Sequence, residues 1–345
     1  MTLKELKKHH YENTELLVSD IPRREIALGL NIRAQHFTSA KELASTLSAR
    51  SNIEGAFAST AYYLDPNVKT PSKRGHLGYD LVFDVDVKPS TNRVDWLYDV
   101  CFRTSALVDI LVNELGFSKE EMHLDFSGGK GFHITIDNPS YRDLSKTDRT
   151  QLVNYIIGEK VDRKSLKFGK GGWNRRFSDF MRNLVKLMND DTKTNYKLLK
   201  SLGLHQTTTK KLGDLLTDST KREALSKGRL DLLDKKVLAS LQSHFFNQQK
   251  QLLSLVDKGV TTDAYRILRI PGTIHPKTGF VSTRLHIDDT NDPDAIFEKI
   301  KDAGGRDEVI ITLTKETVED FDTEKIWPAG THEVPRWLAL HLLHQ

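Results

Sequence analysis

The chain is organised around residues 78–87, which read Gly78-Tyr79-Asp80-Leu81-Val82-Phe83-Asp84-Val85-Asp86-Val87. A short run rich in Val, Leu and Phe predicts a buried strand. Side chains two residues apart on a strand project from the same face, so Asp84 and Asp86 are expected to point the same way. Two carboxylates this close repel each other unless a cation lies between them. A divalent ion such as Mg²⁺ or Mn²⁺ would take them as oxygen ligands, and a solvated strand end explains the pair equally well at this point.

The composition of the 345-residue chain is that of a folded protein with a substantial core. Apolar residues make up 38% of the sequence, and no run of about 18 uninterrupted apolar residues predicts a membrane span. The first residues lack the apolar segment of a signal peptide. The single cysteine, Cys101, excludes an intrachain disulfide and a thiolate zinc cluster. We therefore expect a protein without a membrane partner that works inside the cell, in the cytoplasm.

The formal net charge of +4 is unevenly distributed. Residues 163–236 contain nineteen Lys and Arg against eight Asp and Glu, an excess of eleven positive charges. The remainder of the chain is therefore net acidic by seven. Asymmetry of this kind favours a region that faces nucleic acid, with a solvated helical surface as the alternative interpretation.

Hydrophobic periodicity divides the chain into an α/β part and a helical part. Besides residues 78–87, strands are expected at 23–29, 56–63, 122–126, 132–136, 265–270, 280–287 and 309–313. Helices are expected at 3–17, after Ser39, and at 93–115, 294–303 and 337–343. Residues 140–249 are polar, lysine-rich and helical in pattern. We therefore predict an α/β domain of the α+β kind with mixed or antiparallel sheets, formed by residues 1–139 and 250–345, and a basic helical insertion subdomain at 140–249.

A glycine-rich loop joins two of the expected strands and reads Ser127-Gly128-Gly129-Lys130-Gly131. Glycines allow successive backbone N–H groups to converge on an anion. Ser127 adds a hydroxyl and Lys130 a positive charge, both suited to a phosphate, and His133 follows in the next strand. The spacing is not that of a Walker loop. A tight hairpin with a solvated lysine is the alternative interpretation.

A second basic loop reads Arg269-Ile270-Pro271-Gly272-Thr273-Ile274-His275-Pro276-Lys277-Thr278-Gly279. Arg269, His275 and Lys277 lie within nine residues of one another, on a loop that contains two prolines and two glycines. Such a basic triad suits a triphosphate or a nucleic-acid backbone. Asp257, at the end of an apolar run, is a candidate for a third carboxylate, and spacing alone makes Asp263 an equal candidate.

Taken together, the three blocks resemble the motifs of the archaeo-eukaryotic primase family. Their order and separation match the catalytic small subunits of archaeal DNA primases. Residues 20–25, 31–37, 59–63 and 330–335 resemble further blocks of those subunits, so the resemblance covers most of the chain, with the helical part least similar. It implies the primase catalytic fold and template-directed synthesis of short primers on single-stranded DNA from nucleoside triphosphates. The preference between ribonucleotides and deoxyribonucleotides stays open.

The resemblance also implies roles for individual residues. Asp84, Asp86 and a third carboxylate would hold two Mg²⁺ or Mn²⁺ ions, and alignment back from the second basic loop places the third at Asp257 rather than Asp263. The triphosphate would be bound by residues of both loops, namely Ser127, Gly128, Lys130, His133, Arg269, His275 and Lys277. Lys130 stands where the family usually has an arginine, so a bidentate phosphate contact is not expected there. Many relatives carry a Cys/His zinc cluster, which the single cysteine does not allow, and no zinc is predicted.

The implied partners are the single-stranded template, nucleoside triphosphates and a large subunit that carries an iron–sulfur cluster and forms a heterodimer. The implied location is the nucleoid. A polymerase domain of bacterial end-joining ligases is the nearest alternative, because its motifs are similar, but the helical insertion and the N-terminal blocks favour a primase. A non-catalytic accessory subunit that binds nucleic acid through residues 163–236 is the second alternative. The presence of three carboxylates and three basic loop residues argues against it.

Overall fold

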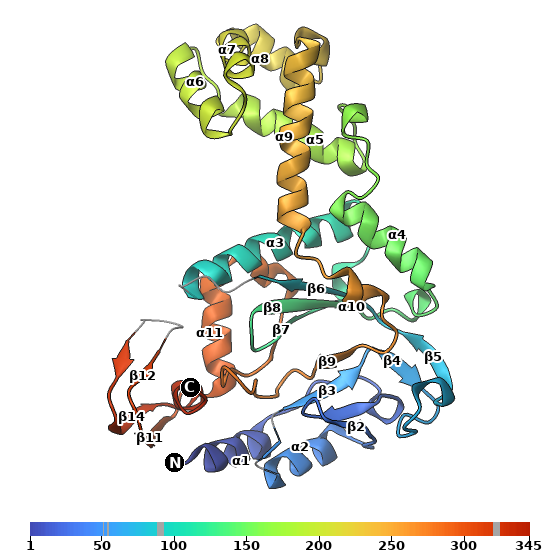
Figure 1. Cartoon of the computed structure of the whole chain (residues 1–345), viewed down its shortest axis with the longest axis vertical. Coiled ribbons are helices and arrows are strands. Elements are labelled where there is room, and N and C mark those ends of the chain that lie inside the picture. Colours follow the sequence, from blue (N-terminus) through green and yellow to red (C-terminus); the bar gives the residue numbers. More distant parts are fainter. Residues whose placement is uncertain (51, 54, 88–92, 320–324) are drawn as a thin grey trace. The chain divides into compact units, whose positions relative to one another are not determined.

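The computed structural model describes residues 1–345 except Ser51, Glu54, residues 88–92 and residues 320–324. The chain forms two compact units (Figure 1). Unit 1 contains residues 1–108, 117–153 and 255–345, and unit 2 contains residues 109–116 and 154–254. Most of α4 (Lys146–Ile157) therefore belongs to unit 1, where Arg149 donates hydrogen bonds to the carbonyls of Tyr79 and Asp80 at 2.7 and 2.9 Å.

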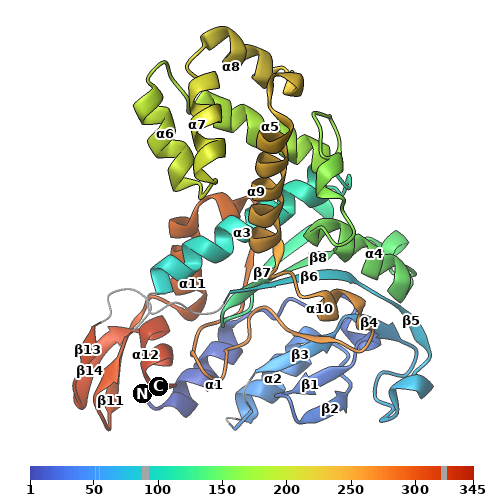
Figure 2. The ribbon, with the colours of Figure 1, turned by 45° about the horizontal axis from the view of Figure 1, so that its top comes forward.

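Unit 1 is built on two four-stranded sheets, which lie one above the other in Figure 2. The first has the order β2-β1-β3-β9 and consists of β1 (Ile26–Leu28), β2 (Ile32–Gln35), β3 (Ala56–Ser59) and β9 (Ile267–Arg269). The second has the order β10-β7-β8-β6 and consists of β6 (Leu81–Asp86), β7 (Met122–Phe126), β8 (Gly131–Ile136) and β10 (Thr283–Leu285). Every strand pair that the structure describes is antiparallel. Of the two predicted possibilities, mixed or antiparallel sheets, the described pairs therefore fit the antiparallel one.

The second sheet has one apolar face and one polar face, because side chains alternate along each strand. On β6, Phe83 and Val85 are fully buried on the apolar face, whereas Asp84 and Asp86 project from the other. The helix α3 (Arg93–Asn113) packs against the apolar face through Trp96, whose ring lies 6.2 Å from that of Phe126. Burial raises the pKa of the Cys101 thiol of α3 to about 12, so this side chain is a core residue, as its position predicts.

The remaining elements of unit 1 surround these sheets. They are α1 (Leu3–Asn13), α2 (Ala40–Ala49), β4 (Ala61–Tyr63), β5 (His76–Tyr79), α10 (Lys258–Thr262), α11 (Pro293–Gly304), β11 (Glu308–Leu313), β12 (Thr317–Val318), β13 (Ile326–Trp327), β14 (Gly330–Pro335) and α12 (Arg336–Leu342). The single strand expected at 56–63 is wrong, because the chain leaves the first sheet at Thr60 and continues as β4 in a separate pair with β5. The strands β12, β13 and β14 carry too short or too polar a pattern to be predicted.

Unit 2 is helical, and residues 154–254, all of which are described, contain no strand, as predicted. Its longer helices are α5 (Gly172–Lys186), α6 (Thr192–Ser201), α7 (Gln206–Leu215), α8 (Ser219–Ser226) and α9 (Lys235–Leu253). Asp191, Asp218 and Asp234 cap the first turns of α6, α8 and α9 through their carboxylates. The core is apolar and includes Phe177, Leu199, Leu212, Leu241 and Phe245. Among the described helices, none combines the length and the apolar character that a membrane span needs.

Candidate active site

The pair of carboxylates lies on the ladder between β6 and β8. Asp84 is opposite His133, and Asp86 is opposite Gly131. The Nε2 atom of His133 lies 3.6 Å from Asp84 Oδ1, which is too long for a hydrogen bond. Lys130 immediately precedes β8, and its Nζ lies 2.9 Å from Asp86 Oδ2. The strand therefore presents both carboxylates on one face, as its alternation predicts.

Asp84 is a buried carboxylate that forms no ion pair with a lysine or arginine among the described residues. Its side chain is 7% exposed, and among the described residues its Oδ1 has no hydrogen-bond partner. Burial raises the pKa of Asp84 to about 7, with further contributions from the charges of Asp86 and Asp257. Burial also lowers the pKa of the neighbouring His133, so this histidine is held neutral and does not supply the missing positive charge. A buried polar atom left in this state costs stability unless something binds to it.

Asp257 supplies a third carboxylate at the site, and its charge contributes to the raised pKa of Asp84. Val256 forms a β-bridge with Val85, and the amide of Asp257 donates to the carbonyl of Asp84 at 2.9 Å. The side chain of Asp257 caps α10, because its Oδ1 accepts from the amide of Gly259 at 2.7 Å. Asp263 lies at the other end of α10 and caps the following turn through the amide of Tyr265, at 2.9 Å.

These carboxylates are not gathered into a finished metal site. Within the described parts of the chain, no group of three or more His, Cys, Asp or Glu side chains is close enough to hold a metal ion. The backbone of Asp257 is nonetheless held beside Asp84 by a hydrogen bond. For Asp257 to act as a metal ligand, its side chain would have to change rotamer and leave the cap of α10.

The glycine-rich loop is a tight hairpin whose geometry depends on its serine and glycines. The amide of Ser127 donates to the carbonyl of Gly131 at 3.0 Å. The Ser127 hydroxyl accepts from the amides of Gly129 and Gly131, at 3.3 and 3.4 Å. A Cβ atom on Gly131 would overlap Asp86 Oδ1 and the carbonyl of Val85. Only glycine therefore lets the loop pass this close to the carboxylate.

The second basic loop packs directly on the first. The Thr278 hydroxyl donates to the carbonyl of Gly128 at 2.5 Å, and a Cβ on Gly128 would lie 2.9 Å from the Cβ of His275. The Nδ1 atom of His275 accepts from the amides of Lys277 and Thr278, at 3.2 and 3.3 Å. In its neutral form this histidine, which lines the cavity, therefore carries its proton on Nε2.

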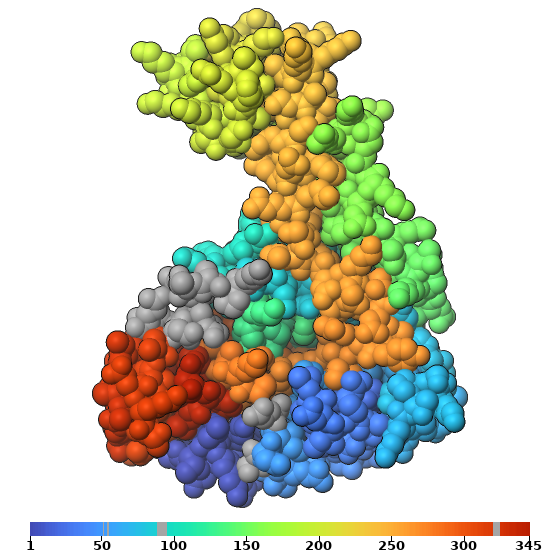
Figure 3. All heavy atoms as spheres, viewed as in Figure 1, coloured from blue at the N-terminus to red at the C-terminus, as the bar shows by residue number. Residues whose placement is uncertain are grey.

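A cavity of about 490 Å³ brings most of the predicted residues together. Figure 3 shows the face on which the orange surface of the segment after α9 borders the blue surface of the N-terminal strands. The side chains that line the cavity carry carboxylate, hydroxyl, imidazole and cationic groups. They include Asp84, Asp86, Ser127, Lys130, His133, Asp263, Arg266, Arg269 and His275. Of the predicted residues, Gly128, Asp257 and the exposed Lys277 do not line it.

Arg269 contributes a buried positive charge to this cavity. Its guanidinium carbon lies 4.5 Å from the centre of the Phe57 ring, and its Nη1 has a long contact of 3.5 Å with the carbonyl of Ile274. It forms no ion pair within the described residues. Burial lowers the pKa of Arg269 to about 10, so the group stays charged at neutral pH and favours an anion beside it.

Two further arginines at the cavity were not predicted. Arg266 lies three residues before Arg269, and its charge acts to lower the pKa of Asp84 against the larger effect of burial. Arg33 lies on β2 and binds Glu25 through two hydrogen bonds, of 2.7 and 3.0 Å. Proximity to the second basic loop could have suggested Arg266. Nothing local to Arg33 indicates that β2 lies beside the carboxylates.

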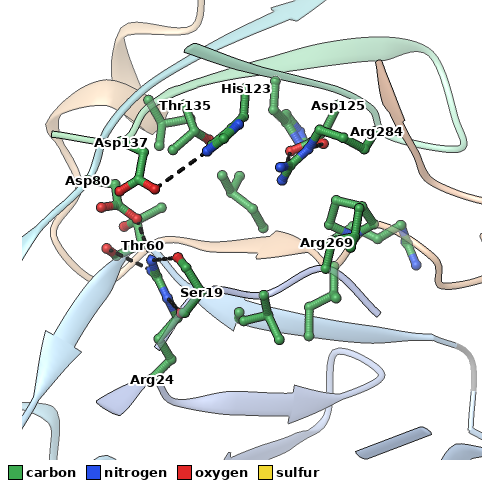
Figure 4. A pocket seen from close by; sticks show the side chains of 18 of the residues that line it. Ser19, Arg24, Thr60, Asp80, His123, Asp125, Thr135, Asp137, Arg269 and Arg284 are labelled. Carbon is green, nitrogen blue, oxygen red and sulfur yellow. Dashed lines mark hydrogen bonds and ion pairs between the residues drawn. The ribbon is translucent and has the colours of Figure 1, made fainter. Parts of the chain in front are cut away.

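A second polar cavity, of about 80 Å³, lies between the two sheets and is drawn in Figure 4. Its charged groups largely neutralise one another in pairs. Arg24 binds Asp80 at 2.7 Å, His123 lies 3.5 Å from Asp137, and Arg284 pairs with Asp125. Arg269 borders both cavities and is the exception. The smaller cavity therefore serves the packing of the sheets, whereas the larger one exposes unmatched charge of both signs.

The comparison with known families agrees with this arrangement of motifs. A family model described as DNA primase small subunit matches residues 83–287, a region that contains Asp84 and Asp86 of β6 and both loops. The chain belongs to the DNA primase small subunit family. The family indicated by the sequence motifs is thus confirmed.

Members of this family from several archaea align with nearly the whole chain. The DNA primase small subunit PriS of Methanosarcina acetivorans is 27% identical over 99% of this chain and 94% of its own length. The protein of the same name from Picrophilus torridus is 28% identical, over 96% and 93% respectively. That from Methanococcoides burtonii is 27% identical, over 90% and 86%. The similarity therefore extends across both units.

Proposed function

We propose that this chain is the catalytic subunit of a DNA primase, which synthesises short primers on single-stranded DNA by adding nucleotides from nucleoside triphosphates to a 3′-hydroxyl. The observation that carries the proposal is Asp84. No described residue donates a hydrogen bond to the Oδ1 atom of this buried carboxylate, and the charges of Asp86 and Asp257 help to raise its pKa. Asp84 also lines a cavity that contains cationic side chains. Such a site suits chemistry in which metal ions and a polyanionic substrate are bound together.

The residues fit a pair of Mg²⁺ or Mn²⁺ ions. Three carboxylates repel one another here, and one of them is buried with an unsatisfied oxygen, which is the donor set that hard cations prefer. Asp84 and Asp86 would be ligands, and the hydrogen bond from the backbone amide of Asp257 to the carbonyl of Asp84 favours Asp257 over Asp263 as the third. When bound, such ions lower the pKa of the attacking 3′-hydroxyl and stabilise charge on the attacking and leaving oxygens.

The triphosphate would be bound by the two loops. Lys130 and Arg269 supply positive charge, and His275, which also lines the cavity, would donate a hydrogen bond through Nε2. The Ser127 hydroxyl and the backbone of Gly128 shape the first loop, while His133 completes its floor in the neutral state. Lys277 is exposed beside the cavity and would reach the distal phosphates only through its long side chain.

These groups would act mainly by orientation and by electrostatic stabilisation. The two loops hold each other rigidly through Thr278, so the phosphate-binding groups need little reorganisation as substrate binds. Lys130 pairs with Asp86 but is more than half exposed, so it is free to move from the carboxylate to a phosphate. The cations would then neutralise the pyrophosphate as it leaves.

The relatives are named as small subunits, and we propose that this chain likewise forms a heterodimer with a large subunit that carries an iron–sulfur cluster. The template strand and nucleoside triphosphates are the other proposed partners, and the nucleoid is the proposed location. The basic character of unit 2 agrees with a role beside nucleic acid.

The test is primer synthesis on single-stranded DNA without any primer, with ribonucleotides and deoxyribonucleotides in separate reactions and with Mg²⁺ or Mn²⁺ added. Asp84→Ala, Asp86→Ala and Asp257→Ala are each expected to abolish products on a gel. Asp263→Ala tests the alternative third carboxylate, and Asp65→Ala is the matched control, since it removes an exposed carboxylate of unit 1 that does not line the cavity. Extension of existing ends without primer synthesis would instead indicate an end-joining polymerase. Full activity of Asp84→Ala or Asp86→Ala would overturn the proposed site.

A further inference from the structure

A groove on unit 2 lies between α6 and α7, which run side by side in Figures 1 and 2. It has a volume of about 500 Å³ and is separate from the cavity of unit 1. Its lining includes four lysines, one tyrosine and one carboxylate, namely Lys193, Lys197, Lys200, Lys210, Tyr196 and Asp214. Because one carboxylate faces four lysines, the lining carries a net charge of +3.

The four lysines of the groove carry charges that no acidic side chain offsets by direct pairing. None of them forms an ion pair with any residue that the structure describes. Several other lysines of unit 2 are paired: Lys221 binds Asp218 at 3.5 Å, Lys211 binds Asp234 at 3.0 Å, and Lys227 binds Glu223 at 2.5 Å. Of the excess of eleven positive charges in residues 163–236, three therefore lie at this groove.

The spacing of the lysines on α6 places them on one face at a cost to the helix. Lys193, Lys197 and Lys200 lie at i, i+4 and i+7, with Tyr196 between them. Like charges at this spacing destabilise a helix. Lys193 also lies in the first turn, where a positive charge opposes the helix dipole. The carboxylate of Asp191 is occupied in capping the amides of Lys193 and Thr194, at 3.1 Å each.

Gly213, in the last turn of α7, lines the groove without a side chain. An ideal Cβ on Gly213 would lie 3.9 Å from both Leu199 Cδ1 and the amide nitrogen of Tyr196, which is ordinary contact. An alanine would therefore fit, and it would favour the helix more than glycine does. The glycine instead leaves room beside the partly exposed Tyr196 ring.

We propose that this groove binds single-stranded DNA, with the lysines contacting successive phosphates and Tyr196 stacking on a base. Unpaired lysines in a row match the repeating charge of a phosphodiester backbone, and an aromatic ring between them is the platform that unpaired bases use. The inference rests on the proposed function in one respect, since that function supplies the single-stranded template as the ligand.

The test is fluorescence anisotropy of a labelled oligothymidylate with the full-length protein, at several salt concentrations. Lys197→Ala combined with Lys200→Ala is expected to weaken binding about tenfold at moderate salt. It is also expected to reduce the slope of log affinity against log salt by about 1.4, or 0.7 for each lost phosphate contact. Lys221→Ala combined with Lys227→Ala is the matched control, because it removes the same charge from α8 and its end. The control is expected to change affinity less than twofold.

Tyr196 separates stacking from charge. Tyr196→Ala should weaken binding several-fold without changing the salt slope, whereas Tyr196→Phe should bind normally. Primer synthesis distinguishes this inference from the proposed function, because groove variants should raise the template concentration for half-maximal rate and leave the rate at saturating template unchanged. Equal losses in the two lysine double variants, or no loss in either, would overturn the inference. So would normal DNA binding together with loss of binding to a large subunit.

Discussion

Asp80 and Asp84 lie four residues apart beside the same sheet and are equally buried, each at 5% exposure. Asp80 accepts hydrogen bonds from Arg24 at 2.7 Å and from the Tyr62 hydroxyl at 3.0 Å, with Arg142 at 3.5 Å. Asp84 has two like charges near it, and no donor to its Oδ1 among the described residues. One carboxylate is therefore fully compensated by the fold, and the other is left for a ligand.

The difference shows how a buried charge separates structural from functional residues. A compensated buried charge contributes to one arrangement of the chain, and its removal leaves partners unpaired. An uncompensated buried charge destabilises the protein when no ligand is bound. A bound ligand of opposite charge offsets this cost, so such a charge indicates a functional site. The predictions below test this contrast, beginning with the largest effect.

Asp84→Asn is expected to reduce primer synthesis by about 1,000-fold or more, because it removes a charge that the proposed metal ions need. The measurement is the rate of product formation at saturating nucleotide, template and Mn²⁺. Unfolding by urea checks that the variant still folds cooperatively. A variant that retains a tenth of the activity would contradict the role of Asp84.

Asp80→Asn is expected to lower the free energy of unfolding by about 3 kcal/mol, because Arg24 is left buried without its carboxylate. The measurement is urea unfolding followed by circular dichroism, in the presence of a chelator. Asp84→Asn is the matched comparison, and under the same conditions it should raise stability by about 1–2 kcal/mol. Equal destabilisation by the two substitutions would break the contrast between the two carboxylates.

His10 is a buried titratable group of another kind, because burial favours its neutral form. Its Nε2 donates to the carbonyl of Gly272 at 2.8 Å, and burial lowers the pKa of His10 to about 4. The folded-state pKa is below the ordinary value, so stability is complete above pH 6.5 and is lost as the pH falls towards 4. We expect a loss of about 2 kcal/mol between pH 7.5 and pH 5.

The measurement for His10 is urea unfolding at both pH values. His344 has a similarly lowered pKa of about 4, so the contribution of His10 is the difference between the parent protein and His10→Gln. Glutamine retains a donor to Gly272 but does not titrate. If the parent and His10→Gln lose the same stability at pH 5, His10 is not the group responsible.

Thr278→Val tests the smallest effect, the rigidity of the two loops. It removes the hydrogen bond to the Gly128 carbonyl with little change of volume and should cost about 1 kcal/mol. We expect the KM for nucleotide to rise about threefold to tenfold while kcat falls less. Thr312→Val, on the exposed face of β11, is the control and should change neither quantity. An unchanged KM in Thr278→Val would show that the loops are positioned by other contacts.

Much of the site was predictable because it depends on short-range geometry. Strand alternation fixes the direction of Asp84 and Asp86, and the glycines of the first loop predict the tight approach of backbone to carboxylate that Gly131 makes. Arg33 could not be predicted, since its place at the cavity depends on packing between sheets. The break between β3 and β4 was also missed, because the apolar pattern continues through Thr60 although the hydrogen-bonded partners change.

The sequence by itself predicted which groups are candidates for the chemistry, and it determined which helical region carries the positive charge. Both follow from residue type and from periods of two and 3.6 residues, which are local properties. Only the tertiary structure distinguished Asp257 from Asp263 by position. The bridge between Val85 and Val256 sets the backbone of Asp257 beside Asp84, whereas Asp263, at the other end of α10, lines the cavity. Only the tertiary structure, likewise, left Asp84 Oδ1 without a hydrogen-bond partner among the described residues while it gave Asp80 three partners.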